Sequence, residues 1–476
     1  MTISFTPNET MDNVILDYGY KIKDNRNQKN SFSKSIIHHL LSIILFSCFL
    51  LPNASNAQTI ITSKQYIASA ESAVVKGDYN TALEYYQIVI KDHPTRYDLY
   101  MNAADAAMQL RHYRLANYYL DGLIKNGNPK DYPLISYKRG LVKKNTEEYD
   151  LAISSFEKYL TDYPTGEAAA MAKEEIANCE WAKTLVFGDK KYEINHLDST
   201  INSIYIDGAP LQNGNNLLYT SGFVYDSTKA PVTHIFSKDL STNKTGLPIT
   251  IAGTQKSDHI ANYTLSTNKQ TAYYNICTQN ENGSFICSIY RANVKDGAQN
   301  ELGAGEKLDS FINKPGFTAT QPSVGFDSVL NSEVLYFTSN RPGGKGGLDI
   351  WRSTIDANSR VSKPENVSEI NTAKDELTPS FFTPAQVLFF STDGYKTLGG
   401  YDVYLTKRTG TTWSTPENAG YPLNSSFDDL YYSVGNGKAS FASSTLACDG
   451  HRVFITFLNK KAIHATALTR DRKSVV

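Results

Sequence analysis

Two internal repeats constrain the fold of this chain more than any other feature of its sequence. In the first repeat, between about residues 60 and 185, an Ala follows a Tyr by three positions and a large residue follows that Ala by four. The units are spaced by 34 and then 36 residues, a Pro closes each of them, and a small residue precedes each Ala by twelve positions. The small residues allow paired helices to approach closely, while the large residue fills the space between them. The three units contain Ala70, Tyr79, Ala82, Tyr86 and Pro94, then Ala104, Tyr113, Ala116, Leu120 and Pro129, then Gly140, Tyr149, Ala152, Phe156 and Pro164.

This pattern resembles the tetratricopeptide repeat, with three units and a final amphipathic helix at 167–183 that caps the stack. An unrelated helical bundle that keeps the Tyr-x-x-Ala spacing is the alternative. Repeats of this family stack into a superhelix whose concave face binds peptides or protein partners. For any single residue on that face, a solvated polar surface is at least as good an interpretation. The resemblance places these residues in the groove: Lys64, Glu71, Asp98, Asn102, Asp105, Gln109, Tyr137, Lys138 and Lys144.

The second repeat lies behind the first, where short Tyr, Phe, Val and Ile runs are separated by Gly, Asn, Asp, Ser and Pro. This composition predicts strands and turns. The strongest unit, 335–351, is a strand, a Gly-rich turn and a second strand opened by Asp, and residues 389–404 repeat it. A hairpin that recurs about every 50 residues is typical of a propeller blade. An apolar residue and an Asn precede the aromatic strand of four units: Ile201-Asn202, Ile312-Asn313, Ile370-Asn371 and Leu423-Asn424.

The sequence therefore predicts an α-solenoid of tetratricopeptide repeats followed by a β-propeller of five or six blades. The β repeat looks like the WD40-like repeat of TolB-type propellers, and the strand near 192–197 is expected to close the ring against the last blade. A β-sandwich is the alternative, but it does not explain the repeat. The predicted bounds are 1–57 for an N-terminal extension and signal peptide, 58–187 for the helical repeats, 188–458 for the propeller and 459–476 for a C-terminal tail.

Several polar residues of the β repeat are interpreted as structural. Arg341, Asp349 and Asp402 stand in turns and at strand ends, where they are expected to make hydrogen bonds rather than to bind a ligand. Two equivalent loops each contain a carboxylate pair that is expected to connect one blade to the next: Asp375-Glu376 and Asp428-Asp429.

No motif in the sequence indicates a reaction. The 47 basic and 48 acidic residues leave the chain nearly neutral, which argues against nucleic-acid binding. The Gly-rich run 343–347 is not a phosphate loop, because Gly346 follows Lys345 where Ser or Thr is needed. There is no G-x-S-x-G or H-E-x-x-H motif, and the His residues lack ligand spacing, so we expect no catalytic residue, no metal and no cofactor. A propeller enzyme can carry catalytic residues on loops of its central channel that a sequence does not mark, and a glycan-binding or hydrolytic propeller is therefore the alternative function.

Taken together, the apolar leader, the helical repeats and the Ser-Asn-Arg-Pro-Gly-Gly hairpin at 339–344 resemble the OmpA-family envelope proteins of Bacteroidetes. The resemblance covers about residues 60–458 and is to the OmpA-like component of the type IX secretion and gliding apparatus. In that family a small β-sandwich and a peptidoglycan-binding domain follow the propeller. Residues 460–476 are too short for either domain, so the resemblance does not imply that this chain is anchored to the cell wall. Contact with peptidoglycan is expected only through a partner. The resemblance implies a non-enzymatic scaffold with protein partners in the groove and on the propeller.

Residues 34–57 have the order of a secretory signal: a positive flank at Lys34, an apolar core and a small-residue cleavage site that ends at Ala57. A membrane anchor is one alternative, but the apolar run falls short of the ~20 residues that span a bilayer. A lipoprotein signal that ends at Cys48 is another, although Phe46 fits it poorly. We expect export, cleavage near Ala57 and a location in the periplasm, peripheral to the outer membrane.

Export permits disulfides. Cys277 and Cys287 flank a hairpin turn predicted at Asn282-Gly283. With a three-residue loop the two cysteines are directly opposed and close enough to bond, whereas a two-residue loop shifts them by one. A disulfide and two free buried thiols both remain open. No Cys-x-x-Cys is present, so neither a redox motif nor a zinc knuckle is supported.

Overall fold

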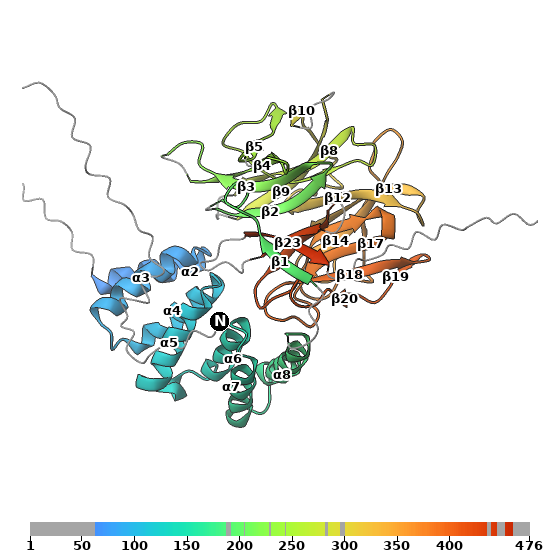
Figure 1. The fold of residues 1–476 in the computed structure, drawn as a ribbon. Coiled ribbons are helices and arrows are strands. Elements are labelled where there is room, and N and C mark those ends of the chain that lie inside the picture. The colour runs from blue at the N-terminus through green and yellow to red at the C-terminus, as the bar shows by residue number, and fades with distance from the viewer. Residues whose placement is uncertain are drawn as a thin grey trace, which may run out of the picture.

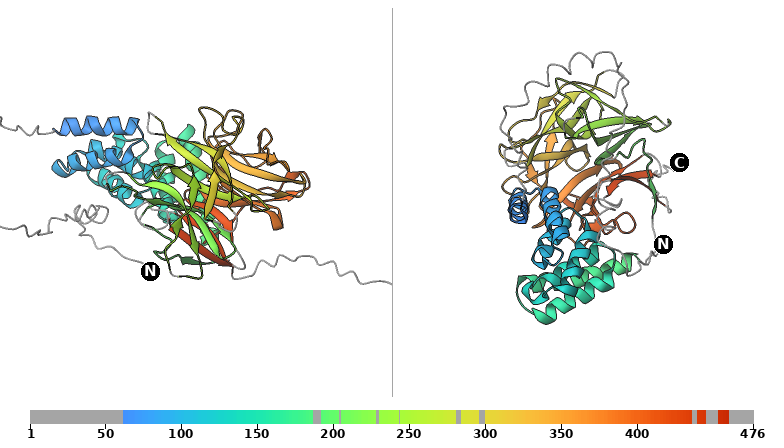
Figure 2. Two further views of the ribbon diagram at one scale, coloured as in Figure 1. Left: turned by 90° about the horizontal axis from the view of Figure 1, so that it is seen from above. Right: turned by 90° about the vertical axis from the view of Figure 1, so that its left-hand side faces the viewer.

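The chain forms a helical N-terminal part and a stranded C-terminal part that lie against each other (Figure 1). In the right-hand view of Figure 2 the helices gather below the strands. The predicted signal, with Cys48 and the cleavage site at Ala57, and the tail after Asn459 lie outside the described residues. No helix in the described ranges is long and apolar enough to cross a membrane. The computed structural model describes residues 62–186, 192–203, 205–227, 230–242, 244–280, 284–295, 300–435, 439–444 and 453–459.

The first domain is a stack of paired helices, as the repeat predicts. Tyr79, Tyr113 and Tyr149 each begin the second helix of a pair. Each helix packs against the next one in the chain, so the pairs form a solenoid. The described helices are α2 (Ser63–Val75), α3 (Tyr79–Asp92), α4 (Tyr97–Gln109), α5 (Tyr113–Asn126), the short η2 (Pro129–Asp131), α6 (Ile135–Asn145), α7 (Tyr149–Asp162) and the capping helix α8 (Glu167–Val186).

The third helix pair shows why small residues recur in the pattern. A Cβ atom on Gly140 would lie 2.5 Å from Cε1 of Phe156, so α6 and α7 reach their separation only because this position has no side chain. Phe156 and Ala152 are fully buried in the same contact. The predicted combination of a small residue on one helix and a large one on its partner is therefore confirmed.

Replacing Gly140 by Ala is expected to lower the free energy of unfolding by about 1–3 kcal/mol, because the new methyl group must displace the Phe156 ring. This loss exceeds the gain of up to ~1 kcal/mol that Ala gives over Gly inside a helix. Urea denaturation followed by circular dichroism measures the difference. The double variant Gly140→Ala, Phe156→Leu should recover part of the stability. A Gly140→Ala protein more stable than its parent would show that the contact between α6 and α7 accommodates the methyl group without strain.

The second domain consists of sheets of short strands. In the described part of the chain, four sheets have four strands, one has five, and β6 and β10 form a separate parallel pair. The strands are β1 (Tyr192–His196), β2 (Asp207–Asn213), β3 (Asn216–Phe223), β4 (Val232–Asp239), β5 (Leu247–Pro248), β6 (Thr250–Ala252), β7 (His259–Leu265), β8 (Thr271–Gln279), β9 (Phe285–Asn293), β10 (Glu301–Ala304), β11 (Glu306–Lys307), β12 (Ala319–Asp327), β13 (Ser332–Ser339), β14 (Asp349–Ile355), β15 (Glu365–Asn366), β16 (Glu376–Phe382), β17 (Val387–Thr392), β18 (Asp402–Thr409), β19 (Thr412–Trp413), β20 (Glu417–Asn418), β21 (Asp429–Val434), β22 (Ala439–Ser444) and β23 (Val453–Asn459), with the short helix η3 (Thr383–Ala385) after β16.

The sheets close into a ring, which makes the domain a propeller. Their innermost strands, β2, β7, β12, β16 and β21, contact one another in that order, and β21 also contacts β2. Strand β1 completes the last sheet by pairing antiparallel with β23, with Tyr192 opposite Asn459. The predicted closure of the ring by the strand near 192–197 is confirmed, and so is the order of a helical repeat domain before a propeller.

The recurring Asn of the β repeat binds the backbone of the preceding blade. The side chain of Asn371 accepts from the N–H of Ile350 and donates to its carbonyl, both at 2.9 Å. These two bonds tie the third strand of one blade to the crossover that leads to the next, which explains why the Asn recurs. The same pair of bonds joins Asn424 to Val403, and Asn313 to Ile289.

The hairpin aspartates play equivalent structural parts in neighbouring blades. Asp349 accepts hydrogen bonds from the backbone N–H groups of Lys345 and Gly346. Asp402 accepts from the N–H of Leu398 at 3.1 Å, four residues earlier in its own hairpin. Burial, followed by repulsion from the nearby Asp429 carboxylate, raises the pKa of Asp402 well above its usual range. Both aspartates therefore hold hairpins in place, as the sequence indicated.

Arg341 and Asp375 connect parts of the ring. Arg341 donates to the carbonyls of Phe311 and Ile312, and its guanidinium lies 5.2 Å from the centre of the Trp351 ring. Burial lowers the pKa of Arg341 to about 10. Asp375 accepts from the N–H of Leu348 at 2.7 Å in one blade and from the Tyr401 hydroxyl at 2.9 Å in the next, so it links two blades.

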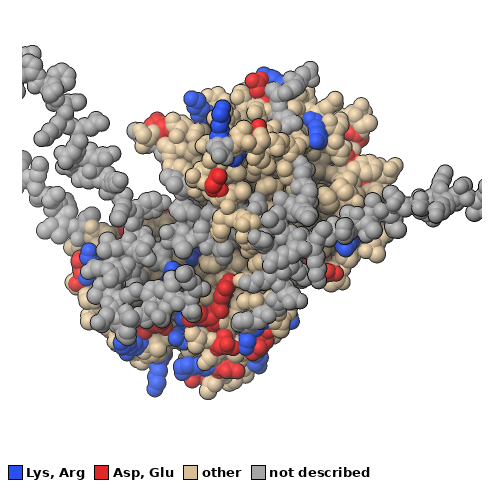
Figure 3. Space-filling view, viewed as in Figure 1, with Lys and Arg blue, Asp and Glu red and all other residues tan. Residues whose placement is uncertain are grey.

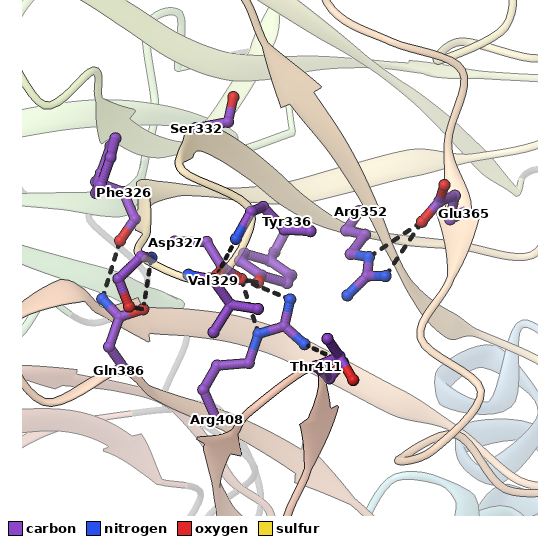
Figure 4. A network of polar contacts seen from close by, with 12 residues as sticks. Phe326, Asp327, Val329, Ser332, Tyr336, Arg352, Glu365, Gln386, Arg408 and Thr411 are labelled. Carbon is purple, nitrogen blue, oxygen red and sulfur yellow. Dashed lines mark hydrogen bonds and ion pairs between the residues drawn. The ribbon is translucent and has the colours of Figure 1, made fainter.

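A buried ion pair crosses the seam between the sheet of β12–β15 and the sheet of β16–β20 (Figure 4). Asp327 Oδ2 lies 2.8 Å from Arg408 Nη2 and accepts from Arg408 Nε at 2.9 Å. The Tyr336 hydroxyl donates to the same oxygen at 3.1 Å. The side chains of Asp327 and Arg408 are 0% and 2% exposed, and the guanidinium lies 4.7 Å from the centre of the Trp413 ring.

Strands β8 and β9 hold Cys277 directly opposite Cys287, and a disulfide joins the two. The N–H of Asn280 donates to the carbonyl of Ser284 at 2.8 Å, so the connection is the longer of the two loops considered, and its residues 281–283 lie outside the described ranges. Cys179 is a buried free thiol, and burial raises its pKa to about 12.

Candidate binding surfaces

The inner helices α2, α4 and α6 of the solenoid carry the residues expected to face a groove. Seven of these nine residues are accessible to solvent. Their side chains are polar and come from all three repeats, so together they form a polar strip along the inner side of the solenoid. The exposed residues are Lys64, Glu71, Asp98 and Gln109, and the partly exposed ones are Asn102, Asp105 and Lys138.

Ion pairs hold part of this strip in position. Lys138 on α6 pairs with Asp105 on α4, which bridges two consecutive repeats. Asp98 accepts from Nε and Nη2 of Arg96 at 2.8 and 2.7 Å, and this hydrogen bonding lowers the pKa of the Asp98 carboxyl. The strip therefore carries charges of both signs at fixed places.

The prediction is wrong for Tyr137 and Lys144, because both are buried. Tyr137 packs its ring against Phe156 and Tyr159, at centroid distances of 5.6 and 5.7 Å. Lys144 is 3% exposed, and its Nζ lies 2.7 Å from a carboxylate oxygen of Glu175 on α8. The capping helix covers the end of the stack, and the ion pair with Glu175 compensates the burial of the lysine.

The centre of the propeller is lined by a bulge that recurs in all of the innermost strands. At each bulge the register with the second strand shifts, and one residue other than Gly has a positive φ. Such backbone costs of order 1–3 kcal/mol and is rare without a structural reason. Its regular recurrence makes these five residues a ring around the channel: Ala209 (φ 53°), Asn262 (59°), Gln321 (53°), Thr378 (51°) and Tyr431 (57°).

Side chains of this ring fill the channel. Gln321 accepts from the N–H of Thr378 at 2.8 Å and donates to the Tyr431 hydroxyl at 3.2 Å, while Asn262 donates to the Asn275 side chain at 2.8 Å. The remaining cavity has a volume of about 60 Å³, and its lining residues are all uncharged. This is far below the ~300 Å³ of a small-molecule site.

No motif predicts this ring, although the sequence contains a weak signal of it. Two positions after the residue with positive φ, a hydroxyl side chain recurs in four of the innermost strands, and Leu211 takes its place in the first. Because the intervening residue is either Pro or Tyr and the positive-φ residue varies from Ala to Tyr, no single motif marks the position. The four hydroxyl residues are Thr264, Ser323, Ser380 and Ser433.

The two domains contact each other through the ends of the solenoid helices. Arg111, in the turn between α4 and α5, places its Nε 3.3 Å from Asp428 of the propeller. The Tyr149 hydroxyl donates to the carbonyl of Leu398 at 3.1 Å, and the Leu398 side chain is fully buried in a cluster that includes Cys179 of α8. Asp428, expected to connect blades, therefore also binds the solenoid.

Charged residues are distributed differently over the two domains. On the face drawn in Figure 3, acidic and basic side chains lie close together over the helical domain, while the visible propeller surface is largely uncharged. Mixed signs on the helical domain agree with the ion-paired strip of its inner helices.

The chain matches no family model and no curated protein. Among solved structures, the TPR domain of Arabidopsis OM64 is 20% identical over 24% of this chain and 93% of its own, with a TM-score of 0.22. The first TPR domain of Spaghetti (RPAP3), bound to an HSP90 peptide, is 17% identical over 26% of this chain and 93% of its own, with a TM-score of 0.23. An α-L-arabinofuranosidase from Lactobacillus brevis is 11% identical over 54% of this chain and 91% of its own, with a TM-score of 0.39. At these identities and TM-scores the matches assign nothing to this chain, and the order of a TPR-like helical repeat domain and a β-propeller rests on the helices and sheets described above.

Proposed function

We propose that this chain is a non-enzymatic scaffold that binds protein partners in the cell envelope. The observation that carries the proposal is the accessible polar strip on the inner solenoid helices, held in place by the Lys138–Asp105 ion pair. Helical repeats of this kind present rigid concave surfaces to peptides and proteins. The Arg111–Asp428 and Tyr149–Leu398 contacts hold the solenoid against the propeller, so partners on the two domains would be kept at a fixed separation.

We further propose a role like that of the OmpA-family component of type IX secretion and gliding, in the periplasm or at the outer membrane. The order of apolar leader, helical repeats and propeller supports this assignment. The disulfide between Cys277 and Cys287 fits an oxidising compartment. Cleavage of the leader near Ala57 is part of the same proposal.

The alternative is a glycan-binding or hydrolytic propeller that uses the central channel. The hydrogen bonds of Gln321 across the channel and the small, uncharged cavity left beside it favour the scaffold over this alternative. If the purified protein bound or hydrolysed an oligosaccharide, and a Gln321→Ala variant lost this property, the result would instead support a glycan site in the central channel.

A crosslinking pull-down from native envelope, with the chain from Gln58 onward as bait, tests the scaffold. The charge-reversed variant Glu71→Lys, on exposed helix α2, is expected to lose a partner that the parent recovers, because the reversal changes the sign of the strip without touching buried residues. Glu157→Lys on α7, which is also exposed, is the matched control and should recover the partner normally. A parent bait that recovers nothing, or equal loss in both variants, would contradict binding through the inner helices.

A further inference from the structure

An apolar cavity lies at the seam between the first two blades of the propeller. It has a volume of about 440 Å³, which is within the range of binding sites in proteins. Strands β3 and β4 form one wall, and β7, β8 and β9 form the other. Two of the lining residues, Ile206 and Phe285, are 51% and 46% exposed, and no Asp, Glu, Lys or Arg is among the described residues of the lining. Large apolar side chains left exposed beside a cavity indicate an interaction surface.

One half of the disulfide forms part of this cavity wall. Cys277 lines the cavity, Cys287 is not among its described lining residues, and both cysteines are partly exposed. In the sheet, Cys277 on β8 stands between Cys287 on β9 and His259 on β7, and His259 also lines the cavity. A thiolate attacks a disulfide sulfur from the side opposite the sulfur that leaves. An attack on Cys277 therefore comes from the β7 side, where His259 and the cavity lie.

The surroundings of Cys277 favour thiol exchange at its sulfur. The side-chain amide of Asn275 donates to Cys277 Sγ at 3.2 Å, and such a donor stabilises a thiolate at this position. Asn275 is fully buried and accepts from the Asn262 amide at 2.8 Å and from the Thr320 hydroxyl at 3.1 Å, so the donor is held in place. Burial lowers the pKa of His259, so its imidazole is neutral at neutral pH and does not alter the charge of the cavity.

The position of the disulfide selects the kind of partner that the cavity fits. Nine residue pairs join β8 to β9, so the hairpin does not depend on the bond between Cys277 and Cys287. The two cysteines are only 10 residues apart, and a bond that closes a short loop stabilises less than one that closes a long loop. An apolar ligand alone would explain the cavity but not the sulfur in its wall, whereas a protein with a reactive thiol needs both an apolar contact and access to a sulfur atom.

We propose that this cavity is the docking surface of a dithiol oxidoreductase, which exchanges its thiols with the bond between Cys277 and Cys287. The surface lies on the propeller and makes no use of the inner solenoid helices, so the proposal goes beyond the scaffold function and does not rest on it.

The exchange has two steps. In the first, a thiolate of the partner attacks Cys277 Sγ, the bond to Cys287 breaks, and Cys287 leaves with the electron pair and takes up a proton. In the second, the other thiol of the partner loses its proton and attacks the partner's own sulfur in the mixed disulfide. Cys277 then leaves as a thiolate, which Asn275 stabilises until it is protonated. In sum, two electrons and two protons pass from the partner's dithiol, which becomes a disulfide, to this chain.

Trapping with a thioredoxin whose second active-site cysteine is replaced by serine tests the proposal. Such a thioredoxin completes the first step but not the second, so a mixed disulfide accumulates. The purified, oxidised chain is mixed with it, the free thiols are alkylated, and the product is identified on a non-reducing gel. We expect a mixed disulfide, and mass spectrometry should place it on Cys277 rather than on Cys287.

Variants of the exposed apolar residues separate docking from simple access to the sulfur. The double variant Ile206→Ala, Phe285→Ala should slow trapping by at least about tenfold, because both side chains would contact the partner. Dithiothreitol is too small to need a docking surface, so it should reduce this variant as fast as the parent. Leu247→Ala, at a position of the first blade that is 71% exposed, is the matched control and should be trapped at the parent's rate.

Three results would overturn the proposal. The first is a mixed disulfide on Cys287, or none at all while dithiothreitol reduces the folded chain. The second is a disulfide that dithiothreitol reduces only in denaturant, since the sulfur is then not accessible. The third is a double variant that reacts as the parent does, or that slows equally with thioredoxin and dithiothreitol, since the apolar residues then form no docking surface. Each of these results leaves the pull-down through the inner helices unaffected, so the two proposals fail separately.

Discussion

Replacing Asp327 by Ala is expected to lower the free energy of unfolding of the propeller by about 3–5 kcal/mol, because it leaves the buried guanidinium of Arg408 without a counter-charge. Asp327 also accepts hydrogen bonds from the Tyr336 hydroxyl at 3.1 Å and from the N–H of Val329 at 2.9 Å, and both donors would lose their partner. The change acts at the seam between two blades (Figure 4). Guanidinium denaturation followed by the fluorescence of Trp413, which lies against Arg408, measures the loss.

Two comparisons distinguish the stability lost with the buried ion pair from the stability lost when any charged side chain is removed. Asp356→Ala removes an ion pair with Arg360, whose side chains are 41% and 74% exposed, and two exposed hydrogen bonds from the N–H groups of Asn358 and Arg360, and should cost only about 1–2 kcal/mol. The double variant Asp327→Leu, Arg408→Met should be more stable than Asp327→Ala, since an apolar pair of similar volume leaves no buried charge. If Asp327→Ala and Asp356→Ala cost the same, the seam does not depend on this ion pair.

The repeats could be predicted from the sequence because each unit makes the same packing contacts between residues that are close in the chain. Tyr79, Tyr113 and Tyr149 recur because each begins the second helix of a pair. Asn313, Asn371 and Asn424 recur because each binds both backbone groups of one strand residue. Contacts of this kind stay within a unit or join it to its neighbour, so spacing alone reveals them.

The binding surfaces could be predicted only in part, because burial depends on what covers a repeat. Lys138 and Lys144 are both polar residues on α6, yet α8 covers Lys144 and supplies Glu175 to pair with it. The ring of five residues around the channel could not be predicted for a different reason. A positive φ is usually marked by Gly, but here residues such as Gln321 and Tyr431 adopt it, held by hydrogen bonds that come from other blades.

The domain interface lies at a place where one equivalent position of two hairpins carries residues of different polarity. Asp349 accepts from the N–H of Lys345, and Asp402 accepts from the N–H of Leu398, so Lys345 and Leu398 occupy the same position in successive blades. Lys345 is exposed, whereas Leu398 is fully buried against Cys179 and other residues of the solenoid. An apolar residue at this one position lets the hairpin of the later blade serve as a docking site for the helices.

Leu398→Asp is expected to separate the two domains, because it removes a buried side chain and would place a carboxylate between α8 and the propeller. The loss of interface stability should be about 3–5 kcal/mol. Calorimetry should then show the helical domain melting apart from the propeller, and small-angle scattering should show a larger radius of gyration.

Lys345→Asp is the matched control for this change, because it places the same carboxylate at the equivalent, exposed position of the preceding blade. It should leave the melting profile and the radius of gyration close to those of the parent. Arg111→Ala removes the Asp428 ion pair, in which the arginine side chain is 39% exposed, and should have a smaller effect than Leu398→Asp. If Leu398→Asp behaves like Lys345→Asp, the contact between solenoid and propeller does not depend on this leucine, and a fixed separation of two bound partners loses its structural basis.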